Sequence, residues 1–327
     1  MNWKNKKSIR IRETVSRALD EDHPVVALES TVIAHGLPYP LNIETARACE
    51  AAVQNEGATA ATIAIVDGVA TIGLSEDEVM VFANSKTTGG KRIDKVGLNN
   101  LAGVMLRRGW GATTVAATMR IAERGGLKVF ATGGIGGVHR GASETFDISA
   151  DLTALARIPL ICVCAGAKAI LDLPKTIEQL ETLGVPVVGY QTEEFPAFYS
   201  RRSKLAVDIT VETPDEAAEV AINHWQAGND SAVLVCAPVP EELEIPFEEA
   251  EQAVREAVTL AERREIRGKA LTPFLLAELE RITAGNTLKT NRALLVNNAS
   301  IAARIAASLN EKVHRRNAED AEKSQRK

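Results

Sequence analysis

The stretch PVVALESTVIAHGLPYPLNIETARACEAAVQNEGATAATIAIV, residues 24–66, decides the fold. It opens with an apolar run at 24–28, continues through an amphipathic stretch at 42–57, and closes with a second apolar run at 60–66. Short β-branched runs predict strands, and the longer stretch that ends at a glycine predicts a helix. A strand, a helix and another strand in this order are typical of a parallel sheet covered by helices.

The same alternation continues along the chain. Further strands are expected at 69–72, 128–131, 160–164, 186–190 and 231–237, and further helices at 76–83, 99–109, 113–125, 174–183, 213–227, 247–264 and 291–308. We therefore predict an α/β fold, a three-layer α/β/α arrangement with a central, mostly parallel but mixed sheet in a single large domain. The domain is expected at 15–310, between a flexible segment at 1–14 and a disordered polar tail at 311–327, because both ends are charged and poor in apolar residues.

Composition argues against several classes of protein. The net charge of −5 is spread over mixed signs, and aromatic residues make up only 4% of the chain, so neither a basic surface nor a stacking platform for nucleic acid is expected. A signal peptide and a membrane-spanning run are not predicted. The four cysteines have no metal-binding spacing and are expected to be buried thiols in a reducing compartment, with the cytoplasm as the default location.

A glycine-rich segment, ATGGIGGVHRG at 131–141, follows one predicted strand. Its five glycines allow close approach of a ligand to backbone N–H groups, which suits an anion. The segment lacks the third glycine of a dinucleotide fingerprint and the Gly-Lys-Ser/Thr end of a P-loop. His139 and Arg140 favour a functional loop over a tight structural one, because they bring a titratable group and a cation.

Polar residues follow four predicted strands, where ligands sit in open α/β sheets. The strand ends are at 29–31, 132–134, 165–168 and 191–192, and we expect them to converge on one crevice. Lys168 follows a very apolar strand, where lost solvation favours a neutral, nucleophilic amine, although an exposed lysine in a first helical turn is the alternative. Glu29 also ends an apolar strand, where a raised pKa suits a general acid, or it pairs with a cation.

The segment that follows the glycines carries a row of oxygens. Asp147, Ser149 and Asp151 share one parity, so an extended backbone would point all three to one side, towards a hard cation or sugar hydroxyls. Helix capping by Ser149 or Asp151 is the alternative. His35 is expected only to line a pocket. Lys95, in a loop, and Asn291, at a helix start that would favour an anion, are each more typical of surface residues when taken alone.

Taken together, these segments resemble one family. The matching stretches are VALESTVIAHG at 26–36, AATIAI at 60–65, GATTVA at 111–116, KVFATGGIGGVHRG at 128–141, TFDISADL at 145–152, VCAGAK at 163–168, GYQT at 189–192, TPFLL at 272–276 and LKTN at 288–291. They are similar to the pseudouridine-5'-phosphate glycosidases, also called the indigoidine synthase A-like family, and the similarity runs from about residue 15 to 310.

The resemblance implies reversible cleavage of the C–C bond of pseudouridine 5'-phosphate to uracil and ribose 5-phosphate, in pseudouridine catabolism. It assigns Lys168 as the nucleophile that forms a sugar adduct and Glu29 as the proton donor. It further implies a homotrimer with small-molecule substrates and no nucleic-acid or membrane partner. The resemblance further implies that His139 and Asn291 line the phosphate and sugar region. It implies that Asp147 binds a divalent ion, manganese or else magnesium, largely through waters. The substrate contacts that it implies are Lys95, Val115, Thr132, Ser149 and Asp151.

Two other functions remain open from the residues. A different Schiff-base enzyme, such as a sugar-phosphate lyase or aldolase, would use the same lysine without a uracil pocket. A non-catalytic sugar-phosphate sensor would bind without turnover. A dehydrogenase is disfavoured because the dinucleotide fingerprint is missing.

Overall fold

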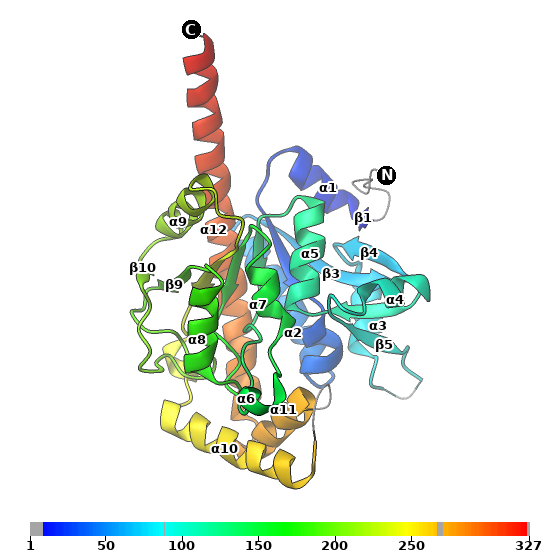
Figure 1. Ribbon diagram of the computed structural model, residues 1–327. Coiled ribbons are helices and arrows are strands. Elements are labelled where there is room, and N and C mark those ends of the chain that lie inside the picture. The colour runs from blue at the N-terminus through cyan, green and yellow to red at the C-terminus, as the bar shows by residue number, and fades with distance from the viewer. Residues whose placement is uncertain (1–8, 88, 267–270, 326–327) are drawn as a thin grey trace.

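The computed structural model describes residues 9–87, 89–266 and 271–325, and it consists of one mixed sheet covered by helices on both faces (Figure 1). The eleven strands run in the order β1-β4-β3-β2-β7-β8-β11-β9-β10, with β6 on β3 and β5 on β6. The strands are β1 (Ile9–Ile11), β2 (Val25–Glu29), β3 (Thr59–Val66), β4 (Val69–Ile72), β5 (Ile93–Val96), β6 (Trp110–Thr113), β7 (Val129–Ala131), β8 (Ile161–Cys164), β9 (Val187–Tyr190), β10 (Ile209–Val211) and β11 (Val233–Cys236).

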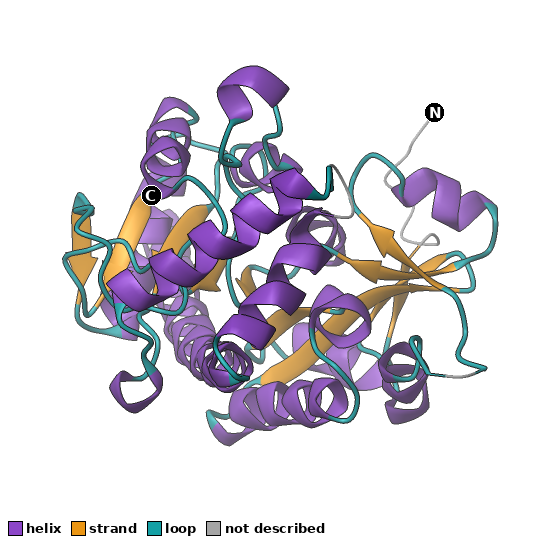
Figure 2. Ribbon diagram, turned by 90° about the horizontal axis from the view of Figure 1, so that it is seen from below, coloured by secondary structure: helices purple, strands orange, loops and turns teal. Residues whose placement is uncertain are grey.

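The helices form the outer layers. They are α1 (Glu13–Asp20), α2 (Leu41–Asn55), α3 (Glu76–Ala83), α4 (Leu101–Leu106), α5 (Val115–Gly125), α6 (Ala142–Thr145), α7 (Ala150–Leu155), α8 (Leu173–Thr182), α9 (Pro214–Gln226), α10 (Phe247–Arg263), α11 (Leu271–Ile282) and α12 (Asn286–Gln325). Helix α12 packs on α2, α9 and the central strands, whereas α5, α7 and α8 lie on the other face (Figures 1 and 2). This arrangement confirms the predicted three-layer α/β/α fold in a single domain.

Parallel pairing dominates the sheet. Among the described strands, only β3 with β4 and β3 with β6 pair antiparallel. Strands β2, β7, β8 and β11 are neighbours, and β7, β8 and β11 are buried along their whole length. Strands buried on both faces are near-continuous apolar runs, which is why the sequence shows them clearly.

Four strands, β1, β5, β6 and β10, were not expected from the sequence. The predicted helix at 99–109 is only the short helix α4, and β6 follows it directly; β5 lies in what was expected to be a loop. All four residues of β6 are buried, and its sequence WGAT has neither alternation nor a β-branched run. Its pairing with β3 and β5 defines it, and pairing over long sequence distances leaves no local pattern.

The chain ends also differ from expectation. Helix α12 continues to Gln325, through residues for which a disordered tail is predicted. Ion pairs hold its continuation against α9: Lys312 contacts Asp215 at 2.9 Å and Glu219 at 3.1 Å, and Arg316 contacts Glu219 at 2.6 Å. At the other end, β1 pairs with β4 and α1 begins at Glu13. Residues 1–8 and 326–327 lie outside the described residues.

Two smaller expectations can be compared with the structure. The four cysteines, Cys49, Cys162, Cys164 and Cys236, are buried free thiols, as predicted. None of the described helices combines the length and the apolar composition that a membrane-spanning helix needs.

The polypeptide after β8 is tied to the glycine-rich segment after β7. The amide of Ile135 donates to the carbonyl of Gly166 at 3.1 Å, and the amide of Lys168 donates to the carbonyl of Ile135 at 3.1 Å. Gly166 has a φ of +81°, and a Cβ there would lie 2.0 Å from the carbonyl oxygen of Pro196. Only glycine therefore allows the segment that carries Lys168 to follow this path.

Replacing Gly166 by alanine is expected to lower the free energy of unfolding by about 3 kcal/mol, since left-handed strain and a backbone clash act together. Gly184→Ala is the matched control, because φ is +66° and no described atom lies within 4 Å of its added Cβ. It should cost only about 1 kcal/mol. Urea unfolding of both variants measures the difference, and equal losses would show that the approach of Gly166 to Pro196 is not tight.

Candidate active site

A cavity opens at the carboxyl ends of the central strands. Glu29 at the end of β2, Lys168 after β8, Lys95 of β5 and Asn291 of α12 all line it. Its remaining wall includes glycines of the segment after β7 and apolar side chains, among them Phe198. The structure thus brings together four of the residues that the sequence singled out, from four separate parts of the chain.

Glu29 is the acidic group of this cavity. Burial raises the pKa of its carboxyl, while Lys168 and the hydroxyl of Thr132 act in the opposite direction. The Thr132 hydroxyl donates a hydrogen bond to the Glu29 carboxylate. A carboxyl with a raised pKa keeps its proton to higher pH, which suits a proton donor.

Lys168 is half-buried and lies in an extended segment, not in a helix. Its neighbour Ala167 pairs with Ile135 in a parallel bridge that continues the β7–β8 pairing beyond the strands. The alternative of an exposed lysine in a first helical turn is therefore wrong. The position of Lys168 is fixed by backbone pairing, while its side chain faces the cavity that Glu29 lines.

Lys95 is a second lysine in the same cavity. It belongs to β5 and not to a loop, and parallel pairing with Ala112 of β6 fixes its register. Burial lowers the pKa of its amine, and the nearby charge of Lys168 acts in the same direction. Solvent still reaches much of Lys95, so this lowering is smaller than that of a fully enclosed lysine.

Asp151 has a structural position. It is 6% exposed; its Oδ1 accepts a hydrogen bond from the amide of Ala116 at 2.9 Å, and its Oδ2 accepts one from the amide of Gly136 at 2.9 Å. It thereby ties the first turn of α5 to the glycine-rich segment. Val115 begins that turn, and its side chain is buried, so it can meet a ligand only through its backbone.

The predicted row of oxygens does not form. Asp151 lies in the first turn of α7, and Ser149 is the N-cap, whose hydroxyl accepts a hydrogen bond from the Asp151 amide at 3.2 Å. The parity argument fails because the backbone turns helical after Ser149. Capping by Ser149, the alternative, is the observed arrangement.

Asp147, the first residue of the predicted row, lies beside His139. The amide of His139 donates to the carbonyl of Asp147 at 3.0 Å. Burial lowers the pKa of His139, and the Asp147 carboxylate opposes this. Among the described residues, no three His, Cys, Asp or Glu side chains are close enough to hold a metal ion together. Asp147 is half-buried, and one carboxylate fits a hard divalent ion that keeps most of its waters.

Arg140 has a different partner from the one expected. Its guanidinium makes two hydrogen bonds to the Glu251 carboxylate of α10, at 2.7 and 2.8 Å. A bidentate pair of this kind engages both terminal nitrogens of the guanidinium. Arg140 therefore attaches the glycine-rich segment to α10 and does not offer a free charge to an anion.

One predicted strand end does not reach the cavity. Gln191 and Thr192 follow β9, which is separated from β8 by β11, and they line a different depression together with Arg201. Sheet order explains the error, because strand order cannot be deduced from the separate strand patterns. Conversely, the sequence offered no signal for Phe198, one of the apolar side chains that line the cavity.

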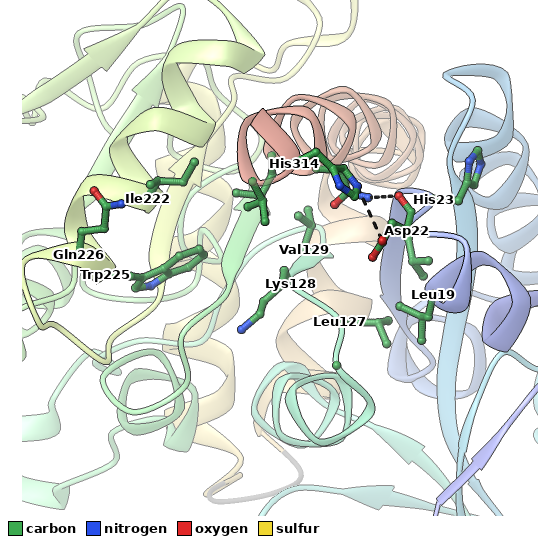
Figure 3. Close-up of a pocket in the computed structure, with 16 residues that line it drawn as sticks. Leu19, Asp22, His23, Leu127, Lys128, Val129, Ile222, Trp225, Gln226 and His314 are labelled. Carbon is green, nitrogen blue, oxygen red and sulfur yellow. Dashed lines mark hydrogen bonds and ion pairs between the residues drawn. The ribbon is translucent and has the colours of Figure 1, made fainter. Parts of the chain in front are cut away.

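A larger cavity lies at the opposite end of the sheet, with a volume of about 580 Å³ (Figure 3). It is bordered by the starts of β2 and β7 and by α9 and α12. Its titratable groups include Asp22, His23 and His314, all exposed, with His314 at 4.0 Å from Asp22. In the smaller cavity, burial and neighbouring charges shift the pKa values of Glu29 and Lys95, so we place the site at the carboxyl ends of the strands.

Comparison with known proteins shows what the whole chain is similar to. The family model described as "Indigoidine synthase A like protein" matches residues 14–308. A pseudouridine-5'-phosphate glycosidase of Caldanaerobacter subterraneus subsp. tengcongensis is 54% identical, over 92% of this chain and 97% of the relative. Another from Solibacter usitatus is 50% identical, over 92% and 99%.

Solved structures show the same fold. The crystal structure of the prealnumycin C-glycosynthase in complex with ribulose 5-phosphate has a TM-score of 0.87 and 37% identity, over 95% of this chain and 99% of that chain. An indigoidine synthase A-like protein from Thermotoga maritima has a TM-score of 0.83 and 37% identity, over 92% and 96%.

Replacing Thr132 by valine tests the electrostatics of the cavity. The hydroxyl stabilises the ionised Glu29 carboxylate, so its removal should raise the pKa of Glu29 further. Carbon-13 NMR titration of labelled glutamate side chains measures this shift. Thr62→Val is the matched control, since Thr62 donates to Glu50 at 2.6 Å and should move only the pKa of Glu50. An unmoved Glu29 titration in Thr132→Val would contradict the hydrogen bond.

Proposed function

Because the chain belongs to the family of indigoidine synthase A-like proteins, we propose that it is a pseudouridine-5'-phosphate glycosidase. It cleaves the C–C bond between uracil and ribose 5-phosphate reversibly, through a covalent adduct between Lys168 and the sugar, in the breakdown of pseudouridine. The relatives described above as pseudouridine-5'-phosphate glycosidases support the reaction. The solved relative in complex with ribulose 5-phosphate supports a sugar-phosphate ligand.

One observation carries the proposal. An amine and a carboxyl, those of Lys168 and Glu29, line the same cavity and act on each other electrostatically. Ordinary glycosidases use two carboxylates and protonate an oxygen or nitrogen leaving atom. In pseudouridine the leaving atom is carbon, so a nucleophilic amine in place of the second carboxylate gives the reaction another route.

The steps follow from these two groups. Glu29 gives its proton to the ring oxygen as the C1′–O4′ bond opens with electrons from the uracil ring, and the Lys168 amine then adds to C1′. After C5 of uracil takes up a proton, the nitrogen lone pair forms a C=N bond while the C1′–C5 bond breaks and uracil leaves. Water hydrolyses the remaining imine to ribose 5-phosphate and free Lys168.

The other residues bind and position the substrate in this scheme. Lys95 and Asn291 contact it from within the cavity that they line with Lys168. Thr132 holds the Glu29 carboxyl, and Asp151 holds the turn of α5 whose backbone faces the substrate. His139 and Ser149 complete the phosphate and sugar end.

A divalent ion, manganese or alternatively magnesium, is part of the proposal, with one ion per subunit. Asp147 would hold it, and its half-buried carboxylate beside His139 fits an ion that keeps most of its water. When bound, the ion supplies positive charge that balances the substrate phosphate.

An assembly and a compartment are also part of the proposal. The family resemblance suggests a homotrimer, and Phe146 and Ile148, which flank Asp147, are 82% and 44% exposed, as apolar residues of a subunit contact are in an isolated chain. The four free thiols fit the cytoplasm, where thiols stay reduced.

Lys168→Ala is expected to lower the rate of uracil release from pseudouridine 5'-phosphate by roughly 10³-fold or more, because the nucleophile is lost, while substrate binding persists. Ultraviolet absorbance follows the release, and calorimetry follows binding. Lys128→Ala, at the opposite end of the sheet (Figure 3), is the control and should release uracil at the wild-type rate. Uracil release by Lys168→Ala at that rate would remove Lys168 from the mechanism. Wild-type protein that binds without releasing uracil would indicate another Schiff-base enzyme or a sensor.

Removal of metal tests the role of Asp147. EDTA should abolish uracil release, and added manganese should restore it. Asp147→Asn is expected to weaken manganese binding by about tenfold or more, measured by electron paramagnetic resonance of the free ion. Glu144→Gln, an exposed neighbour on α6, should bind manganese as wild type does. Unchanged affinity in Asp147→Asn would place the ion elsewhere.

A further inference from the structure

A histidine that the proposed mechanism does not use lies in the active-site cavity. His35 lines the cavity together with Glu29, Lys95, Lys168 and Asn291. It belongs to a short π-helical turn, Val32–Gly36, that follows directly on the strand carrying Glu29. Single π-helical turns are frequent at functional sites.

Side chains from helix α2 and from the loop after α3 hold this turn in place. The Asn42 amide donates to the carbonyl of Ile33 at 2.8 Å, and the Ser85 hydroxyl donates to that of Ala34 at 3.3 Å. The Lys86 amine donates to the carbonyl of His35 itself at 3.3 Å. Three successive carbonyls are thus fixed by side chains, so the imidazole is presented from a preorganised backbone.

The imidazole has an unused nitrogen. Nε2 of His35 is buried and has no hydrogen-bond partner among the described residues. Buried polar atoms are rarely left unpaired, and a ligand is one of the partners that can complete them. Burial lowers the pKa of His35, and the charges of Lys86 and Lys95 act in the same direction, so the ring is neutral near pH 7.

The neutral imidazole of His35 suits the uracil part of the substrate better than the phosphate. A phosphate dianion favours cations and helix N-termini. Uracil instead alternates N–H donors with carbonyl acceptors along its edge, and a neutral imidazole nitrogen can accept from one or donate to the other. Asn291, whose amide offers both a donor and an acceptor, lines the same cavity.

We propose that His35 is a specificity-determining residue that binds the leaving uracil through a hydrogen bond from or to its Nε2. This inference rests on the proposed glycosidase activity and names the side chain that recognises the base.

The reverse reaction tests it, because uracil and ribose 5-phosphate can be varied separately. His35→Asn keeps a polar atom near the Nδ1 position and loses the one at Nε2, whereas His35→Gln places its amide near Nε2. The KM for uracil should rise about tenfold in His35→Asn and stay within about threefold of wild type in His35→Gln. The KM for ribose 5-phosphate should stay unchanged in both, and His23→Asn, at the opposite end of the sheet, should match wild type throughout (Figure 3).

The possible outcomes either support or refute the role of His35. An unchanged KM for uracil in His35→Asn, or an equal rise in the KM for both substrates, overturns the role of His35 while leaving the glycosidase activity standing. Wild-type protein that joins no uracil to ribose 5-phosphate overturns both. Should His35→Asn fail to fold, nitrogen-15 NMR of wild-type histidines decides, with His35→Gln identifying the signal: uracil must shift the Nε2 resonance of His35, and an unmoved resonance refutes the contact.

Discussion

The parallel pairing of three neighbouring strands, β2, β7 and β8, is the constraint on which the site depends. Parallel strands end at the same edge, so the residues that follow them meet there. Pairing continues past the strands, since the Thr132 amide donates to the Val163 carbonyl at 3.0 Å and Ala167 pairs with Ile135. Backbone hydrogen bonds therefore position Glu29, Thr132 and Lys168 at the same edge of the sheet.

In the cavity, burial and nearby opposite charges shift the pKa values of Glu29 and Lys95 in opposite directions. Burial favours the neutral form of the Glu29 carboxyl, and Lys168, Thr132 and Lys95 favour its ionised form. Burial likewise favours the neutral amine of Lys95, against the pull of Glu29 and Asp151. A carboxyl that keeps its proton is what acid-assisted opening of a sugar ring requires. The proposed chemistry therefore depends on the desolvation of Glu29.

The features of the fold and of the candidate site that depend on local sequence patterns can be predicted from the sequence. Buried parallel strands appear as apolar runs, so the α/β class, the strand ends of β2, β7 and β8, and the candidacy of Glu29 and Lys168 all follow from them. The resemblance to a known family then raised Lys168 from an ambiguous lysine to the expected nucleophile. Side chains whose role depends on distant partners gave no such pattern.

Lys95, Arg140 and Lys312 show why contacts between distant segments leave no local pattern in the sequence. Lys95 enters the cavity because β6 joins β3 antiparallel and brings β5 with it, a pairing between segments that are far apart in sequence. Arg140 looked like an anion-binding cation, but Glu251, 111 residues later, pairs with both of its terminal nitrogens. The polar tail lacks a core of its own, and its helix is attached through ion pairs of Lys312 with α9. Contacts of this kind are decided by tertiary structure.

The central claim is that Lys168, and not its neighbour Lys95, bonds to the sugar. Both amines line the cavity, and burial lowers the pKa of Lys95, so position and desolvation make Lys95 a real competitor. Reduction of wild-type protein with borohydride in the presence of ribose 5-phosphate, followed by peptide mass mapping, distinguishes them. The account predicts a reduced pentose phosphate on the peptide that contains Lys168, and a modified Lys95 with an unmodified Lys168 would contradict it.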